Sequence, residues 1–135
     1  MTEEKKSLPI WILIVSGLFA LLELMVSVLI CFSTESVLEQ VDLNAKGVDY
    51  LVYFWASRQF ALGFIFGFAA FKRSIPMLTI AYIFFLVMFV GEFFIGVSQK
   101  DNPLMISALV MGIISSAMIF AINKRRLSIL ENKKT

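Results

Sequence analysis

The chain has 135 residues, 59% of them hydrophobic, and a net charge of +2, a composition typical of a single membrane domain. It contains no histidine, which excludes histidine-ligated haem and histidine-containing metal sites. Its one cysteine, Cys31, can form neither an intrachain disulfide nor a dithiol redox pair, and we expect it to be buried in apolar surroundings.

Four apolar runs follow one another along the chain, at residues 9–32, 51–71, 75–97 and 103–122. Each has about the 20 residues that a helix needs to cross the hydrocarbon core of a bilayer. The first run is longer than the apolar part of a signal peptide and no small-residue cleavage site follows it, so we expect a retained span. The sequence therefore predicts an all-α fold, a single four-helix transmembrane bundle with antiparallel helices over residues 1–135.

The loops between these runs carry turn and capping patterns. Residues 36–39 have the form of a capping box and apolar residues follow them, which predicts a short helix at about 36–43 on the outer membrane surface, with an irregular loop as the alternative. Residues 72–74 are too few for anything but a helical hairpin. Asn102 before Pro103 is the pattern of an N-cap followed by proline at the first helical position.

The basic residues predict the orientation. Only Lys46 and Lys100 lie in the first and third loops between the spans. Nine other basic residues lie before the first span, in the second loop or after the fourth span, which would share the opposite side of the membrane: Lys5, Lys6, Lys72, Arg73, Lys124, Arg125, Arg126, Lys133 and Lys134. Because basic loops stay in the cytoplasm, we expect both termini to be cytoplasmic in a plasma membrane, that of a bacterium by default. We expect the tail at 124–135 to be solvated, with binding of anionic lipid as the alternative.

Three charged residues lie inside apolar runs: Glu23 in the first, Arg58 in the second and Glu92 in the third. Each would cost about 3 kcal/mol as a lone charge at bilayer depth, and at about 1.5 Å per residue all three lie at a similar depth below the outer boundary. We therefore predict that they meet, with the Arg58 guanidinium bonded to one carboxylate in bidentate fashion. Two interpretations stay open, a structural ion-pair network and a site for a ligand, an ion or a proton with Glu92 as its titrating member.

Smaller polar and glycine patterns accompany this cluster. A stripe on the first span holds Ser16, Ala20, Glu23 and Ser27, and Gln59 adjoins Arg58, so Ser27 and Gln59 are added to the candidate site. Serines in membrane helices usually bond their own backbone. Small residues four apart predict close helix packing, with the fourth span or a second copy as the partner of the second span; they are Gly63, Gly67, Ala108 and Gly112.

The hexapeptide at 58–63, Arg-Gln-Phe-Ala-Leu-Gly, stands in a recognisable plan: a long first span, an outer loop, a basic hairpin and an acidic residue, Glu92, late in the third span. This plan resembles small four-helix membrane proteins of the broad DoxX-like group over about residues 10–122. The resemblance implies the same four-helix fold, and some relatives are linked to quinone or sulfur redox chemistry. Small multidrug resistance transporters also have four spans and a glutamate in the first, but they lack the long outer loop and the arginine in the second.

Three functions follow as hypotheses. The first is transport or binding of a proton, an ion or a small polar solute, and the second is a structural or accessory subunit in which the charges lock the bundle. The third is a lipid- or quinone-binding protein or an enzyme, which ranks last because the sequence offers no Ser-based triad, no Cys pair and no metal cluster. We expect no cofactor, no metal and no nucleic acid. The expected partners are the lipid bilayer and either a second copy or a membrane partner protein.

Overall fold

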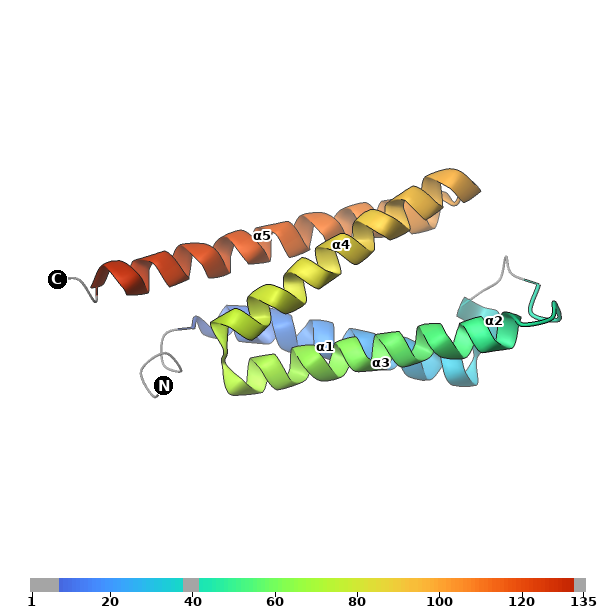
Figure 1. Cartoon of the computed structure of the whole chain (residues 1–135), viewed down its shortest axis with the longest axis horizontal. Helices are drawn as coiled ribbons and strands as arrows, with labels where there is room; N and C mark the ends of the chain where they lie inside the picture. The colour runs from blue at the N-terminus through green and yellow to red at the C-terminus, as the bar shows by residue number, and fades with distance from the viewer. Residues whose placement is uncertain (1–7, 38–41, 133–135) are drawn as a thin grey trace. The chain divides into compact units, whose positions relative to one another are not determined.

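The computed structural model describes residues 8–37 and 42–132, and within them the chain is helical (Figure 1). The helices are α1 (Ile10–Phe32), the short α2 (Thr34–Val37), α3 (Val48–Lys72), α4 (Ile75–Gln99) and α5 (Asn102–Asn132). Four of them are long and apolar enough to cross a membrane, which supports a multi-pass membrane protein. The helix bounds follow the four apolar runs closely, except that α5 continues past residue 122 to Asn132.

The chain forms two compact units. One unit holds residues 13–72, with most of α1, all of α2 and α3, and the other holds residues 1–12 and 73–135, with α4 and α5. Large apolar side chains are exposed along all four long helices, for example Leu18, Phe64, Val87 and Ile113. In water such a surface would be unfavourable, so the apolar exterior indicates contact with lipid.

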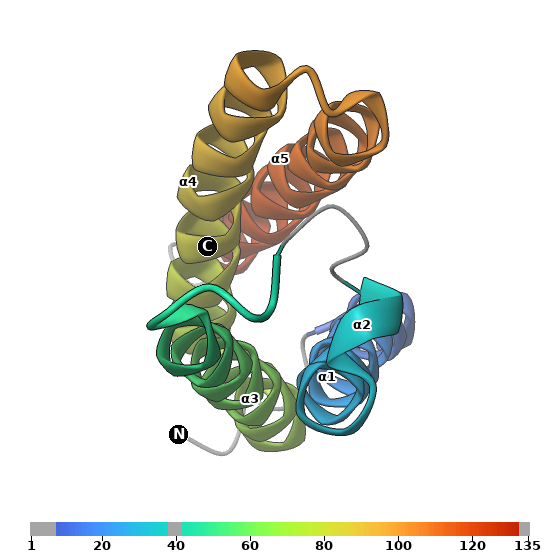
Figure 2. The same cartoon turned by 90° about the vertical axis from the view of Figure 1, so that its right-hand side faces the viewer.

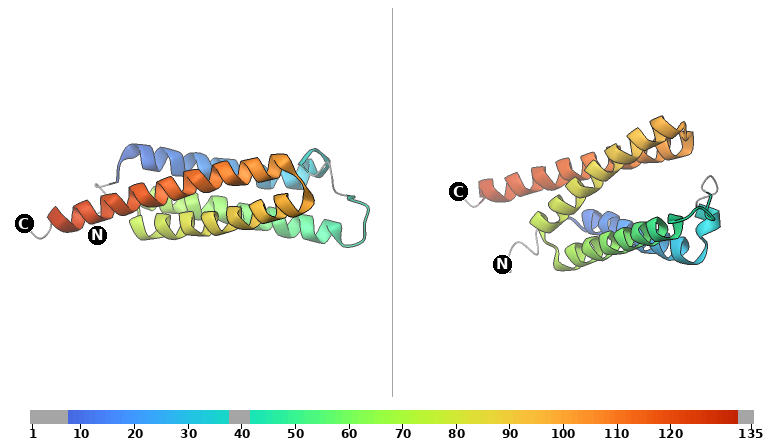
Figure 3. Two further views of the ribbon diagram at one scale, coloured as in Figure 1. Left: turned by 90° about the horizontal axis from the view of Figure 1, so that it is seen from above. Right: turned by 45° about the vertical axis from the view of Figure 1, so that its right-hand side comes forward.

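Helices α1 and α3 lie side by side in the first unit (Figure 3). The Ser27 hydroxyl donates to the Ala56 carbonyl oxygen at 2.8 Å, and the rings of Phe19 and Phe66 are 6.1 Å apart. Residues earlier in α1 therefore contact residues later in α3. At one end, Ile30 of α1 forms a buried cluster with Val52 and Ala56 of α3.

Gly63 explains how closely these two helices approach each other. A Cβ atom at Gly63 would lie 2.7 Å from the Leu24 Cγ and 2.9 Å from the Ala20 carbonyl oxygen, distances that leave no room for a methyl group. One turn later, a Cβ at Gly67 would lie 3.7 Å from the Ala20 Cβ, an ordinary contact. The partner of the Gly63 and Gly67 ridge is thus α1, whereas we had predicted the fourth span or a second copy, because Ala20 gives α1 a matching small surface.

The connection between α2 and α3 differs from the predicted helix at 36–43. Helix α2 covers Thr34–Val37, residues 38–41 lie outside the described part, and residues 42–47 form turns. The Asp42 carboxylate accepts a hydrogen bond from the Asn44 backbone N–H at 3.0 Å, and Gly47 has a φ of +90°. An Asx-turn and a left-handed glycine favour a turn over a helix, so Leu43 does not continue a helical face.

Helices α4 and α5 form a hairpin in the second unit (Figure 2). Lys100 ends α4 in the left-handed conformation, and its N–H bonds the carbonyls of Gly96 and Val97. The Asp101 carboxylate then accepts a hydrogen bond from the Leu104 N–H at 3.1 Å, so Asp101 caps α5. We had predicted Asn102 as the cap; Asn102 is instead the first helical residue, because the carboxylate one position earlier reaches the N–H of Leu104, the third helical residue.

Close backbone approach also holds this hairpin together. A Cβ atom at Gly96 would lie 2.9 Å from the Met105 backbone nitrogen. Farther along the pair, Phe85 and Phe89 stack with ring centroids 5.1 Å apart on the buried side of α4. The core of this hairpin is therefore aromatic on α4, and small residues such as Ala108, 2% exposed, face it from α5.

The position of Cys31 differs from the prediction that it is buried in apolar surroundings. The side chain is exposed, not buried, because Ile30 takes the position that faces Val52 and Ala56 and the next residue turns away by about 100°.

Candidate functional site

The buried face of α1 carries three polar side chains, Ser16, Glu23 and Ser27. Ser16, Ala20, Glu23 and Ser27 fall three or four residues apart, so they share one side of the helix, and all four are buried. Glu23 is 2% exposed, the lowest exposure of any charged side chain among the described residues. A carboxyl group so far from water must exchange its hydration for contacts inside the protein.

The α1–α3 register places Gln59 opposite Glu23. Ser27 bonds Ala56 on one side, and Ala20 meets Gly63 on the other. Glu23 lies between Ser27 and Ala20 on α1, as Gln59 lies between Ala56 and Gly63 on α3. Because both helices rise by the same distance per residue, the two side chains share one level of the interface. Gln59 is 6% exposed, so at this level of the interface an amide group and a carboxyl group are both buried.

Ser27 differs from most other hydroxyl residues of the described helices. Thr34, Thr79, Ser107, Ser115 and Ser116 each donate to a backbone carbonyl three or four residues earlier in their own chain, as expected for such residues in apolar helices. Ser27 instead donates across to α3. An interhelical bond of this kind fixes both the distance and the register of the two helices next to Glu23.

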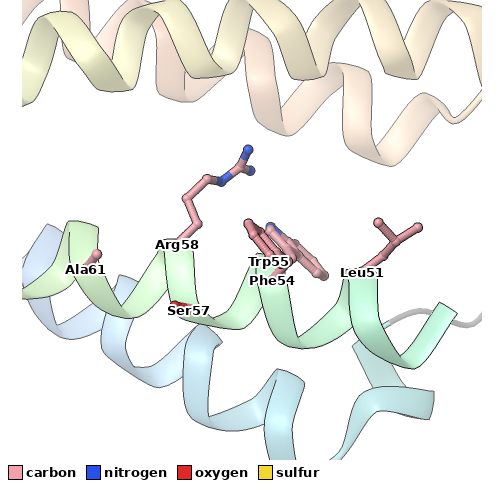
Figure 4. Close-up of a pocket in the computed structure, with 6 residues that line it drawn as sticks. All are labelled: Leu51, Phe54, Trp55, Ser57, Arg58 and Ala61. Atoms are coloured by element: carbon pink, nitrogen blue, oxygen red, sulfur yellow. The ribbon is translucent and has the colours of Figure 1, made fainter. Parts of the chain in front are cut away.

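Arg58 lies on another side of α3. Figure 4 shows its side chain extending away from α3 and from α1, and the side chain is exposed. It lines a hollow of about 440 Å³ whose other walls are apolar or small, namely Leu51, Phe54, Trp55, Ser57 and Ala61. A guanidinium beside such walls is a strong donor of charge-assisted hydrogen bonds to an anionic or polar group that enters the hollow.

Glu92 lies on α4 and is half-buried. It belongs to the α4–α5 unit, whereas Glu23 and Arg58 belong to the α1–α3 unit. Of the predicted site residues, Glu23, Ser27 and Gln59 are buried, and Arg58, the residue before Gln59, is exposed. The meeting of Glu23, Arg58 and Glu92 stays a prediction.

The predicted packing residues occupy interfaces inside each unit. Gly63 and Gly67 face α1, as described above. Ala108 is buried on α5, and a Cβ at Gly112 would lie 4.0 Å from the Phe89 Cβ of α4. These small residues therefore set the separation of the α1–α3 and α4–α5 pairs.

Metal ligands do not gather in the described part of the chain. Residues 8–37 and 42–132 contain no group of three or more Cys, Asp or Glu side chains placed to hold a metal ion. The chemistry that the arrangement does offer is hydrogen bonding and proton exchange, from one buried carboxyl group, one buried amide and one exposed guanidinium.

Gln59 was added to the predicted site only because it adjoins Arg58. Its position along α3 opposite Glu23 of α1 was not predicted. The signal was present in the spacing: Gln59 and Gly63 are four residues apart on α3, and Ala20 and Glu23 are three apart on α1. That spacing becomes informative once Gly63 is known to face Ala20.

Comparisons with family models, with curated proteins and with solved structures find no match for this chain.

Proposed function

We propose that the protein is a small multi-pass membrane protein that binds and moves a proton, an ion or a small polar solute, with Glu23, Arg58 and Glu92 as its charged groups. The observation that carries the proposal is the hollow beside α3, where Arg58 is exposed within an apolar span. Ionisable residues at membrane depth usually face a pathway or a cavity. Glu92, half-buried on α4, is the proposed proton-exchanging group.

A flux measurement on reconstituted protein tests this proposal. Purified protein in liposomes with a pH-sensitive dye inside should acidify or alkalinise the lumen faster than empty liposomes when a potassium diffusion potential is imposed. Glu92→Gln and Arg58→Ala should each lose most of that flux. Glu35→Gln is the matched control, because Glu35 lies on α2 outside the four spans and its side chain is exposed. Equal flux in wild type, Glu92→Gln and empty liposomes would contradict the proposal for protons, and the same design with potassium or small organic ions inside tests the other solutes.

A structural or accessory role is the second candidate, and the α1–α3 interface favours it. Glu23, Ser27 and Gln59 lie in a closely packed helix pair, with a hydrogen bond from Ser27 to Ala56 fixing its register. Charges that lock a bundle stabilise it only as a set, since removing one buried partner leaves the others uncompensated. If Arg58 meets Glu23 and Glu92 as predicted from the sequence, Arg58→Ala should lower the thermal midpoint strongly, whereas the transport proposal requires lost flux in a variant that still folds. An unchanged midpoint in Arg58→Ala would remove this candidate.

The finer features of the membrane arrangement belong to the same proposal. We place both termini in the cytoplasm and the protein in a bacterial plasma membrane, on the strength of the basic residues at 72–73 and 124–126. The resemblance of residues 58–63 to the DoxX-like group supports a four-helix plan of that type. Cysteine accessibility from either side of intact cells, with single cysteines at Lys46 and Lys124 in a Cys31→Ser background, checks the orientation.

A further inference from the structure

An apolar groove runs along one side of the α1–α3 pair and has a volume of about 560 Å³. Small residues form its bottom, since Ala20 and Gly63 line it and are buried. Large apolar side chains form its walls, since Leu21, Phe64 and Phe68 line it and are exposed. Among the described residues the lining carries no polar side chain, so it holds water poorly and suits a hydrocarbon chain.

Gly17 keeps the groove open. A Cβ atom at Gly63 would lie 2.7 Å from the Leu24 Cγ, whereas a Cβ at Gly17 would meet nothing within 4 Å. The space beside the two helices is therefore wider at Gly17 than at the point of closest approach. A membrane protein leaves no such space empty, because close packing of lipid or protein against its surface replaces the contacts that water cannot supply.

The aromatic wall of the groove leads to a lysine. Phe64, Phe68 and Lys72 are four residues apart, so they share one side of α3. The Phe64 and Phe68 rings are nearly parallel, with centroids 6.4 Å apart and an interplanar angle of 5°. The Lys72 Nζ lies 5.5 Å from the centroid of the Phe68 ring, a cation–π contact. The ring that lines the groove thus also holds an ammonium group near the end of the groove.

The charge at this end of the groove is positive. Lys72 is the last residue of α3 and is exposed, where the apolar run ends and lipid headgroups begin. A lysine at this depth strengthens the binding of an anionic headgroup about fivefold. The parts of α1 and α3 that reach this end, residues 10–22 and 59–72, contain no Asp or Glu. These two helices therefore add no negative charge that would repel an anion beside Lys72.

We propose that the groove binds one anionic phospholipid of the bilayer, with an acyl chain along Phe64 and Phe68 over Gly17 and the phosphate bonded to the Lys72 ammonium group. The proposal commits to this lipid because its two parts, a long apolar chain and a negative group at one end, match the apolar groove and the lysine that follows it. The charged residues of the proposed transport site are not part of this lining, so the inference does not depend on transport.

Native mass spectrometry of the full chain in detergent tests the headgroup contact. The protein is titrated with dioleoyl phosphatidylglycerol or with dioleoyl phosphatidylcholine, which have the same acyl chains and differ in net charge. Wild type should bind the anionic lipid about fivefold more tightly. Lys72→Gln should remove that preference and keep the affinity for phosphatidylcholine. Lys46→Gln is the matched control and should keep the preference, because it removes one exposed positive charge outside the lining of the groove.

A second pair of variants tests the acyl-chain contact. Gly17→Leu should weaken the binding of both lipids, because the new side chain takes the open space without a clash at its Cβ. Gly91→Leu is the matched control and should bind both lipids as wild type does. Gly91 lies on α4 and also has nothing within 4 Å of an added Cβ.

Three results would overturn the proposal: equal affinity of wild type for the two lipids, a preference that survives Lys72→Gln, or lipid binding that is unchanged in Gly17→Leu. A dimer that dissociates in Gly17→Leu while lipid binding stays the same would also overturn it and would assign the groove to a second copy. If Gly17→Leu does not fold, the comparison of Lys72→Gln with Lys46→Gln decides alone. Lost flux in Glu92→Gln bears on the proposed function, so the two proposals can fail separately.

Discussion

The α1–α3 and α4–α5 pairs treat buried polar groups differently. In α1–α3, Ser27 donates across the interface and Gln59 and Glu23 share a buried level. In α4–α5, the buried Ser115 donates to the Met111 carbonyl oxygen of its own helix, and aromatic side chains fill the buried side of α4. A membrane gives little hydrophobic force for joining helices, so close packing and hydrogen bonds must do so. A hydrogen bond between the helices therefore fixes the alignment of α1 with α3. In the α4–α5 pair, the packing of aromatic and small side chains and the caps at the turn take that role.

The largest expected effect is at Gly63, where the α1–α3 pair is closest. Gly63→Ala should destabilise the protein by about 2 kcal/mol, because the added methyl group meets the Ala20 backbone oxygen, which cannot rotate away. Thermal or denaturant unfolding in detergent measures the loss. Gly67→Ala is the matched control and should be nearly neutral, since its Cβ has room. Equal midpoints for the two variants would contradict the close approach of α1 and α3.

Gly96 is the corresponding position in the α4–α5 pair. Gly96→Ala should cost about 1–2 kcal/mol, because the methyl group meets the backbone of Met105. The loss should be smaller than at Gly63, since the nearby hairpin turn can open slightly. Gly91→Ala, with nothing within 4 Å of the added atom, should be neutral or stabilising by unfolding measurements. A Gly96→Ala loss greater than that of Gly63→Ala would reverse the comparison.

The cap of α5 gives a third expected effect. Asp101→Ala should cost about 1 kcal/mol, the usual value for a lost N-cap, because the Leu104 N–H loses its acceptor. Asn102→Ala should have almost no effect. Unfolding of both variants under the same conditions decides which residue caps the helix, and a larger loss in Asn102→Ala would restore the interpretation made from sequence.

The smallest effect separates the two kinds of serine. Ser27→Ala should cost about 0.6 kcal/mol, the mean for interhelical hydrogen bonds in membranes, because the Ala56 carbonyl oxygen loses its extra donor. Ser115→Ala should lie within error of wild type, since its bond stays inside α5. Both midpoints can be read from one series of thermal scans. A loss at Ser115 as large as that at Ser27 would remove the distinction between the two pairs.

The positions of the helices could be predicted from the sequence, because they depend on the length of the apolar runs and those runs are visible in the sequence itself. The runs at 9–32 and 75–97 correspond to α1 and α4 almost residue for residue. The end of α5 was not readable in this way. Residues 123–132 are mostly polar, and the apolar pattern that marks a span says nothing about whether a helix continues into water.

Contacts between helices were harder to predict, because they depend on which faces meet. The spacing of Gly63 and Gly67 identified a packing ridge but not its partner, since Ala20 on α1 and Ala108 on α5 offer similar small surfaces. The Asp101 cap was missed because Asp101 and Asn102 are both good caps, and only the backbone path selects one. The placement of Gln59 opposite Glu23 depends on how α1 and α3 are aligned along each other. The sequence of one helix alone does not determine that alignment.

The length of α5 has a mechanical consequence. The helix continues from the apolar run to Asn132 without a break, so about ten residues, or about 15 Å, extend past residue 122. These residues include Lys124, Arg125 and Arg126, whose side chains are exposed. A continuous helix of this length is stiff, so a rotation of its apolar half turns this basic segment through the same angle.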